Sequence, residues 1–335
     1  MIPTAYLLVG WIPKIWELFE IGGGFVDVFE VKLDKMTLVA DVKESYFIQR
    51  FIDTGMLEVY DYGVDIVQGT LFPKMLYKES AYFTYDQRNA DTMRKRNFRL
   101  EFNPAKITDQ QKDFIRKEIL VHCAKDSIAF SRLDIALDCN EDISGYALET
   151  LRSKSAAVFY GINGGITGKY LGQRESHVFT RLYDKKLKEL KDKKRELRSL
   201  EISGESSSMY SEEQKSKLID EISLIENMDS WWRLEFELKG SKKIEEMLIN
   251  GFSVLLDSIR IIDYDFSKIK GLEKATMVGL LERPEIFNEL SKNTKSKYKK
   301  MFRELEGKDL SVDFKQALQK KEPLILAELK GWMVI

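Results

Sequence analysis

The sequence predicts an α+β fold: two tandem, duplicated antiparallel-sheet units with helices on one face, followed by a helical C-terminal region. Three strand-like segments of the first half recur in the same order in the second half. KMTLVADV (35–42) resembles RLDIALDC (132–139), YFTYDQR (82–88) resembles FTRLYDKK (179–186), and FRLEFNP (98–104) resembles WRLEFELK (232–239). After Gly240 the pattern becomes mostly helical. Chance similarity among strand-like segments is the alternative to duplication.

The first unit is predicted to combine strands with two helices. Thr108 and Gln111 form a capping-box pattern at the start of the second of these helices. We expect strands at 31–41, 57–68, 71–86 and 98–104, and helices at 44–54 and about 109–123.

The second unit is predicted to repeat this arrangement around an inserted helical hairpin at about 187–228. The hairpin is either a projecting finger, a dimer contact or a solvated insertion. We expect strands at 130–138, 158–172, 177–183 and 231–239, with a helix at 143–155. Further helices are expected at 242–259, about 271–281, 284–305 and 311–332.

The predicted domains are an N-terminal segment (1–30), the first unit (31–125), the second unit (126–265) and the helical C-terminal region (266–335). The N-terminal segment is apolar but contains charged residues and lacks a basic leader. We therefore expect it to be neither a membrane-spanning helix nor a signal peptide.

Composition excludes several kinds of site. The 335 residues are 44% hydrophobic and 32% charged with a net charge of −1, so we expect a soluble, cytoplasmic protein without a global basic field. Two cysteines, Cys123 and Cys139, and two distant histidines, His122 and His177, exclude a disulfide framework and a paired-histidine metal site. Any divalent ion would be held by carboxylates, which favours Mg²⁺ or Mn²⁺.

The segment 177–190 contains a candidate nucleophile. Arg181 and Tyr183 share one face of a predicted strand, and Lys185 and Lys186 follow directly. Because nearby cations favour phenolate, we expect them to lower the pKa of Tyr183 and activate it to attack a phosphate. A structural tyrosine at a strand end is the common alternative.

Four carboxylates lie on two other predicted strands. Asp134 and Asp138 share one strand face, and so do Glu235 and Glu237. If the strands are neighbours, these carboxylates can converge on one oxygen-ligated ion. The interpretation requires the phenol hydroxyl to lie beside them and outside the packed interior. The alternative is a pair of surface salt bridges, Arg132–Asp134 and Arg233–Glu235.

The two halves differ at the acidic positions. Only Glu101 in the first half corresponds to Glu235 in the second. The aspartates of the second half correspond to apolar or neutral residues of the first, Met36 or Thr37 and Val39 or Ala40. The first half is therefore expected to serve as a scaffold or as a DNA-holding surface.

A local basic segment lies in the C-terminal region. KNTKSKYKKMFR (292–303) contains six basic residues and no acidic residue in a chain of net charge −1. It is therefore the best candidate for a surface that contacts DNA phosphates. A solvated lysine-rich helix face is the alternative.

The motifs together resemble one family. NFRLEFNP, FSRLDIALDCNEDIS, KYLGQRESHVFTRLYDKK, WWRLEFELK and LSKNTKSKYKK occur in this order within residues 31–305. The chain resembles the Rep_trans-type replication initiators of Gram-positive rolling-circle plasmids, the family of the staphylococcal resistance-plasmid initiators.

The resemblance implies a homodimeric initiator that binds the double-strand origin of a plasmid. It would nick and rejoin one strand through a 5′-phosphotyrosyl intermediate, leaving a 3′-hydroxyl primer. Tyr183 would be the nucleophile, and Asp134 and Glu235 would bind Mg²⁺ or Mn²⁺, to which we add Asp138 and Glu237 from their shared faces. Its partners would be origin DNA, the nicked single strand and a host replicative or repair helicase, with no membrane.

The resemblance also assigns roles to the predicted units. The first would be non-catalytic, the second would be the nicking domain, and the C-terminal region would recognise the origin. Arg181 and Arg174 are predicted to balance charge during catalysis. Origin discrimination is predicted for Lys292, Asn293, Thr294, Lys295, Ser296 and Lys297.

The chain departs from the family pattern in two places: its hairpin at 187–228 is longer than expected, and residues 1–30 match no known part. Two other readings stay open. One is a non-catalytic DNA-binding replication-control protein of the same fold. The other is a recombinase or a conjugative relaxase, although relaxases normally hold their metal with histidines.

Overall fold

The structure is a computed structural model of the chain. It describes residues 28–42, 53, 57–62, 66–71, 81–86, 96–150, 155–202, 209–305 and 307–333. Apart from residues 28–30 and Asp53, the N-terminal segment (1–30) and the helix expected at 44–54 lie outside this part.

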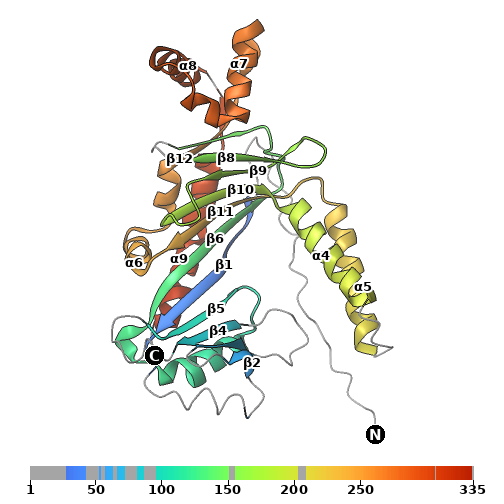
Figure 1. Cartoon of the computed structure of the whole chain (residues 1–335), viewed down its shortest axis with the longest axis vertical. Coiled ribbons are helices and arrows are strands. Elements are labelled where there is room, and N and C mark those ends of the chain that lie inside the picture. Colours follow the sequence, from blue (N-terminus) through green and yellow to red (C-terminus); the bar gives the residue numbers. More distant parts are fainter. Residues whose placement is uncertain are drawn as a thin grey trace.

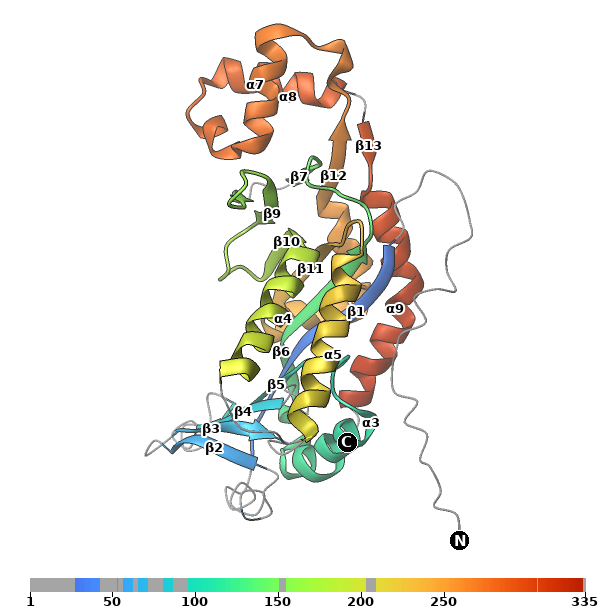
Figure 2. The ribbon, with the colours of Figure 1, turned by 90° about the vertical axis from the view of Figure 1, so that its right-hand side faces the viewer.

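A ten-stranded antiparallel sheet forms the body of the protein (Figures 1 and 2). Its strand order is β2-β3-β4-β5-β1-β6-β11-β10-β9-β8. The first five strands in chain order are β1 (Val28–Ala40), β2 (Leu57–Tyr62), β3 (Ile66–Leu71), β4 (Ala81–Asp86) and β5 (Phe98–Phe102). The other five are β6 (Ala129–Cys139), β8 (Ala156–Tyr160), β9 (Ile166–Leu171), β10 (Val178–Asp184) and β11 (Trp232–Lys239). The α+β prediction is confirmed.

The strand order is symmetric about the central β1–β6 pair. Counting outward from that pair, β5 corresponds to β11, β4 to β10, β3 to β9 and β2 to β8. The three recurring sequence segments fall on β1 and β6, on β4 and β10, and on β5 and β11, so each is matched to its counterpart. The two predicted units therefore join edge to edge in one continuous sheet.

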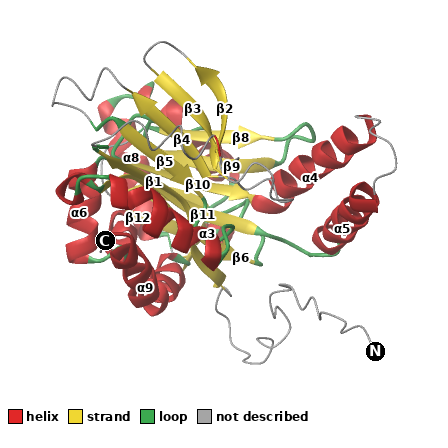
Figure 3. Cartoon of the chain, turned by 90° about the horizontal axis from the view of Figure 1, so that it is seen from below, coloured by secondary structure: helices red, strands yellow, loops and turns green. Residues whose placement is uncertain are grey.

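One face of this sheet is apolar and covered by helices. α6 (Ser241–Asn250) packs on β6 and β11, and α9 (Ser311–Met333) packs on β1 and β6 (Figure 3). Alternate strand residues such as Met36, Leu100 and Phe236 are fully buried beneath these helices. Burial of each side chain of this size contributes about 1.5–3 kcal/mol. The opposite face of the sheet carries the polar alternates.

The helix expected at 109–123 is present in three pieces. The capping box of Thr108 and Gln111 is confirmed, because the hydroxyl of Thr108 accepts a bond from the backbone N–H of Gln111 and the amide of Gln111 accepts one from Thr108. α3 (Asp109–Phe114) continues as a π-helical turn (Ile115–Ile119) and a 3₁₀ turn (Leu120–His122). Ile115 and Ile119 of this helix belong to the main core.

The expected helical hairpin projects from the end of β10 (Figure 1). α4 (Lys185–Ile202) and α5 (Met209–Glu226) pack against each other through Leu218, Ile222 and Ile225. Lys193 pairs with Glu221 at 2.5 Å and Lys194 with Glu226 at 2.6 Å, which joins the two arms along their length.

A second, smaller core lies beyond the main sheet. A three-stranded sheet of β7 (Ala147–Thr150), β12 (Ile259–Tyr264) and β13 (Gly307–Asp309) leads to α7 (Gly271–Glu282) and α8 (Lys292–Glu304) (Figure 2). Ile262, Tyr264, Met277, Leu280 and Phe302 form its centre. This region contains the helices expected at about 271–281 and within 284–305, whereas the helix expected at 311–332 is α9, which packs on the main sheet.

The prediction of a helix at 143–155 is wrong for its described residues 143–150, which form a turn and a strand. The side chain of Asp142 accepts a bond from the backbone N–H of Ser144 (2.9 Å) and forms a turn. Residues 147–150 then form β7, because they pair with β12. Sequence periodicity could not show this pairing, since both strands are short and distant in the chain.

The helices expected at 242–259 and 284–305 are shorter than predicted. α6 ends at Gly251, whose φ of +86° lies in the left-handed region. A 3₁₀ segment, Ser253–Ser258, and the unpredicted strand β12 follow. α8 begins only at Lys292, where the Ser291 hydroxyl accepts a bond from the backbone N–H of Thr294.

Candidate active site

Three neighbouring strands place charged side chains on the polar face of the sheet. β11 lies between β6 and β10, so Glu237 stands opposite Asp134 and Glu235 stands opposite Arg181. Tyr183 stands opposite Arg233 in the same register. The two strands that carry the predicted carboxylates are therefore neighbours, as required.

Asp134, Glu235 and Glu237, called the acidic trio below, surround one guanidinium nitrogen. Nη2 of Arg181 donates to Oε1 of Glu235 and lies 3.7 Å from Oε2 of Glu237 and 4.0 Å from Oδ2 of Asp134. Arg132 closes the cluster: it binds both oxygens of Asp134 at 2.7 and 2.6 Å and donates to Glu237 at 2.8 Å. All three carboxylates are buried.

Asp138 belongs to a second cluster. Arg233 is 1% exposed and binds the two oxygens of Asp138 at 2.5 and 2.7 Å. Nη1 of Arg233 lies 3.0 Å from Asp34, and Nζ of Lys32 lies 3.7 Å from Asp138. Of the two salt bridges expected from sequence, Arg132–Asp134 is present. Arg233 pairs with Asp138, because the two residues stand directly opposite in register.

The Tyr183 hydroxyl lies at the acidic trio. Its oxygen donates a hydrogen bond to Oε2 of Glu235 at 2.9 Å. The side chain as a whole is buried, with 6% of its surface exposed, and only its placement beside the carboxylates meets the expectation.

The expectation that cations lower the pKa of Tyr183 is wrong for this structure. Burial and the neighbouring Glu235 carboxylate raise that pKa, because both disfavour phenolate. The lysines that follow are engaged elsewhere: Lys185 pairs with Glu189, and Lys186 donates to the backbone oxygen of Met228. The phenol is therefore held protonated.

Asp134 resists ionisation. Burial raises its pKa to about 6, and the charges of Glu235 and Glu237 act in the same direction against the effect of Arg132. A carboxyl that resists ionisation in this way signals a place where an added cation would be stabilised.

The donors of the acidic trio fit a hard divalent cation. Among the described residues, no group of three or more His, Cys, Asp and Glu side chains stands ready to hold an ion. However, three carboxylates already converge on a cationic nitrogen, and oxygen-only donors are those that Mg²⁺ and Mn²⁺ prefer. Asp138 is not one of these donors, because it belongs to the second cluster, where its described partners are Arg233 and Lys32.

Arg174 is not brought to this cluster. It is exposed and precedes β10, whereas Tyr183 lies near the other end of that strand. The five residue steps from Val178 to Tyr183 correspond to about 17 Å. The backbone oxygen of Arg174 accepts a bond from Lys239, which holds the turn against β11.

The predicted origin-discriminating residues occupy the first turns of α8, apart from the ten-stranded sheet (Figure 2). Two of their cations contact neighbouring groups: Lys297 pairs with Glu273 at 2.7 Å, and Lys295 donates to the backbone oxygen of Asn288 at 3.1 Å. The exposed members are Lys292, Asn293, Ser296 and Lys297.

Known proteins are similar in sequence to this chain. Residues 35–122 match the family model described as "Replication initiation protein, N-terminal". Two Staphylococcus aureus proteins, each named "Replication initiation protein", are 30% and 28% identical to this chain. Each alignment covers 90% of this chain, and they cover 84% and 85% of the two relatives.

The chain belongs to the replication initiation protein family. The resemblance to initiators of Gram-positive rolling-circle plasmids is thereby confirmed. A solved structure of the rolling circle replication initiator protein from Geobacillus stearothermophilus has 11% identity and a TM-score of 0.36. That comparison covers 76% of this chain and 97% of the other, and the score is too low to support an argument.

Sequence reasoning missed two charged residues of the initiator's polar face, Lys32 and Asp34. Both come from β1, whose pairing with β6 cannot be read from either strand alone. A signal was present, since Lys32 and Asp34 alternate with apolar Val31 and Leu33.

Within the described residues, no helix is both long and apolar enough to cross a membrane.

Proposed function

We propose that this initiator binds the double-strand origin of a rolling-circle plasmid and nicks and rejoins one strand through Tyr183. The observation that supports the proposal best is the hydrogen bond from the Tyr183 hydroxyl to Glu235 (2.9 Å) beside two further carboxylates and two arginines. These are the groups that a phosphoryl transfer to tyrosine requires: a nucleophile, a proton acceptor and cations for the phosphate.

In the proposed reaction the Tyr183 oxygen attacks a DNA phosphorus atom, and its proton passes towards Glu235. The bond between phosphorus and the 3′-oxygen breaks, and that oxygen takes up a proton. A 5′-phosphotyrosyl bond and a free 3′-hydroxyl result. Because the phosphotyrosyl bond keeps the energy of the broken ester, the reverse attack can rejoin the strand without a nucleotide cofactor.

The acidic trio would hold Mg²⁺ or Mn²⁺, which would polarise the phosphate and offset its charge. Arg181 and Arg132 would then be released from the carboxylates to contact phosphate oxygens. We retain Arg181 as a catalytic residue in the proposal and do not include Arg174, because of its distance from Tyr183.

Activation requires a rearrangement at the site. In the DNA-free chain Tyr183 is buried and protonated, and Arg181 occupies the centre of the acidic trio. Binding of the scissile strand must expose the phenol and draw Arg181 away. The initiator would thus stay inactive until DNA is engaged.

The expected partners follow from the family resemblance. We propose that the initiator acts as a homodimer on origin DNA, holds the nicked single strand and recruits a host replicative or repair helicase. The first turns of α8 are the proposed origin-discriminating surface.

The decisive experiment maps the covalent protein–DNA adduct. The protein is incubated with supercoiled plasmid carrying its origin and Mg²⁺ or Mn²⁺, digested, and the peptide bearing the nucleotide is sequenced. We expect Tyr183, and we expect Tyr183→Phe to bind the origin without forming the adduct. Tyr82→Phe is the matched control, because Tyr82 is an exposed tyrosine on β4 of the same sheet.

An adduct that persists in Tyr183→Phe would refute the assignment of the nucleophile. Origin binding by the wild-type protein without any adduct would instead support the second candidate, a non-catalytic replication-control protein. The buried, protonated state of Tyr183 is the observation that favours this second candidate.

A further inference from the structure

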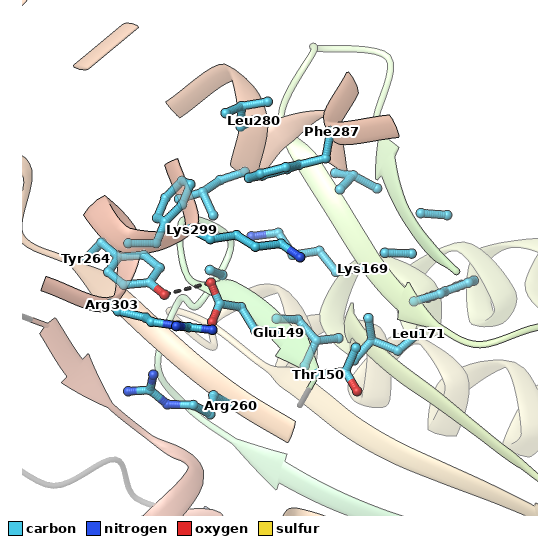
Figure 4. Close-up of a pocket in the computed structure, with 18 residues that line it drawn as sticks. Glu149, Thr150, Lys169, Leu171, Arg260, Tyr264, Leu280, Phe287, Lys299 and Arg303 are labelled. Atoms are coloured by element: carbon cyan, nitrogen blue, oxygen red, sulfur yellow. Dashed lines mark hydrogen bonds between the residues drawn. The ribbon is translucent and has the colours of Figure 1, made fainter. Parts of the chain in front are cut away.

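A pocket of 570 Å³ lies between the ten-stranded sheet and the C-terminal helices (Figure 4). Its walls come from β7 and β12, from the edge strands β8 and β9, and from α7 and α8. The two hydrophobic cores meet here, since Leu171 belongs to the main core and Leu280 and Phe302 to the smaller one. The volume lies in the usual range for small-ligand sites.

The pocket is strongly basic. Among the described residues, four cationic side chains line it against the single carboxylate of Glu149, namely Lys169, Arg260, Lys299 and Arg303. Glu149 accepts a hydrogen bond from the Tyr264 hydroxyl at 2.6 Å, so its charge is already engaged. Figure 4 shows Lys169 and Lys299 extending into the pocket from β9 and α8.

Two of the cations are available to an external anion. Lys299 and Arg303 lie one turn apart on α8, where like charges at this spacing destabilise a helix. In the described part of the chain, neither residue has an ion-pair partner, whereas Lys297 pairs with Glu273 and Lys300 with Glu304. No described carboxylate therefore neutralises these two charges.

The remaining wall is aromatic. Tyr264 and Phe302 have ring centroids 5.4 Å apart, and Phe287 and Phe302 have centroids 6.3 Å apart. Flat rings beside cations are the combination that binds nucleotides, because a base stacks on the rings while its phosphate pairs with lysine and arginine.

We propose that this pocket binds one nucleotide unit, with its base against the aromatic wall and its phosphate on Lys299 and Arg303. The inference goes beyond the proposed cleavage reaction, because such binding needs neither Tyr183 nor a metal ion. The nucleotide would come from single-stranded DNA or from a free nucleotide, which share this chemistry.

One further observation agrees with a bound phosphate. Burial lowers the pKa of Lys169 to about 8, and a phosphate beside it would raise that pKa again. Lys169 pairs with Leu182, the residue before Tyr183, so its side chain lies on the opposite face of the sheet from the phenol. The pocket and the candidate active site are therefore separate sites.

Equilibrium binding to the full-length protein in EDTA tests the proposal without cleavage. Three probes are compared: a hexamer of deoxythymidine, thymidine 5′-monophosphate and inorganic phosphate. The test variant is Lys299→Gln/Arg303→Gln. The control is Lys300→Gln/Lys320→Gln, which removes the same charge from exposed residues outside the pocket.

We expect the test variant to bind the hexamer or the mononucleotide roughly tenfold more weakly, and the control to change binding less than about twofold. Inorganic phosphate should bind at least about tenfold more weakly than the mononucleotide, because it lacks a base to stack. A hexamer that binds much more tightly than the mononucleotide identifies DNA as the source, and the converse identifies a free nucleotide.

Either of two results would overturn the proposal. One is equal loss in the test and control variants, which would mean a diffuse charge effect. The other is equal binding of inorganic phosphate and the mononucleotide, which would mean an anion site without base recognition. Neither result bears on the Tyr183 adduct, so failure here is separable from failure of the proposed cleavage.

Discussion

The two units of the sheet share a scaffold but differ at the positions that face the polar side. Counting from the β1–β6 pair, Glu101 on β5 takes the position of Glu235 on β11, and Thr84 on β4 takes the position of Tyr183 on β10. The hydroxyl that could attack phosphorus is thus a phenol in one unit and a threonine in the other.

The acidic positions differ in the same way. By register, Lys35 and Val39 stand where the second unit has Asp134 and Asp138, and Asn103 stands where it has Glu237. Val39 was among the residues expected there from sequence, whereas Lys35 replaces the expected Met36 or Thr37. Thr37 faces the same side of β1 as Lys35, so the expected match of Thr37 with Asp134 was displaced by two residues along the strand.

Glu101 of the first unit lies between two cations, whereas Glu235 of the second unit lies beside two further carboxylates. Glu101 pairs with Lys35 at 2.5 Å and with Arg99 at 2.9 Å, so two cations serve one carboxylate. In the second unit three cations, Arg132, Arg181 and Lys239, contact three buried carboxylates, and burial gives Asp134 a raised pKa. The duplicated backbone therefore supplies the geometry, while a few substitutions on one face give the second unit more carboxylates for each cation.

Glu235 and Glu101 occupy corresponding positions in the two units, and replacing each by glutamine compares their roles. Glu235→Gln should reduce metal-dependent strand cleavage by roughly 10³-fold or more, because it would remove a proposed cation ligand and the proposed acceptor of the Tyr183 proton. Glu101→Gln should change cleavage less than about twofold. The measurement is nicking of supercoiled origin plasmid, with origin binding followed in parallel.

Both variants should bind origin DNA as the wild type does. Loss of binding in Glu235→Gln would mean that this glutamate is structural. Comparable losses of cleavage in both variants would remove the functional distinction between the units.

Sequence specificity is expected to lie outside both units. Replacing Lys292, Asn293, Thr294 or Lys295 at the start of α8 should change the preference between two origins by roughly 10- to 100-fold, as for loss of base contacts. Cleavage of a single-stranded substrate should be nearly unchanged. Competition between plasmids with different origins measures the preference, and Lys300→Gln on the same helix is the control. An equal loss on every sequence would show phosphate contacts only.

Arg181 is the cation at the centre of the acidic trio. Removing the guanidinium in Arg181→Met should tighten Mn²⁺ binding roughly tenfold, because the three carboxylates lose their resident positive charge. The matched variant Arg99→Met, beside Glu101, should leave Mn²⁺ binding unchanged. Titration calorimetry or the electron paramagnetic resonance of free Mn²⁺ gives both affinities. Weaker binding in Arg181→Met would mean that Arg181 supports the ion instead of competing with it.

Sequence patterns predicted much of the fold because strand alternation and repeated segments are local. They placed Asp134, Glu235 and Glu237 on shared faces, and the register brings these residues together. They did not show that Tyr183 is buried, since burial depends on how the face is filled by partners such as Arg181 and Glu235. Asp138 was grouped with the trio because spacing along one strand does not reveal that Arg233 stands directly across from it.

The smallest expected effect concerns a charge that is buried only in the second unit. Lys169 on β9 is 7% exposed, and by register Gly69 takes its position in the first unit. Its Nζ donates to the backbone oxygens of Ser144 and Tyr146. Burial lowers its pKa from 10.5 to about 8, while the more distant carboxylates of Glu282 and Asp142 act in the opposite direction.

The sign of the pH effect follows from proton binding. Between pH 8 and 10.5 the unfolded chain keeps the Lys169 proton that the folded chain has released, so the free energy of unfolding should rise with pH in this window. The rise attributable to this residue is at most about 1.4 kcal/mol per pH unit and roughly 3 kcal/mol in total. Below pH 8 both states hold the proton and the contribution is constant.

Urea denaturation at pH 8, 9 and 10 should therefore show a steeper increase for the wild type than for Lys169→Met. The comparison of slopes is needed because the variant also leaves two carbonyl oxygens without their donor, which lowers its stability at every pH. Identical slopes would mean that Lys169 titrates normally, and the pocket would then hold enough water to solvate its charge. A steeper slope in the wild type would show that the second unit buries a cation at a loss of stability, at the edge where we infer that a phosphate binds.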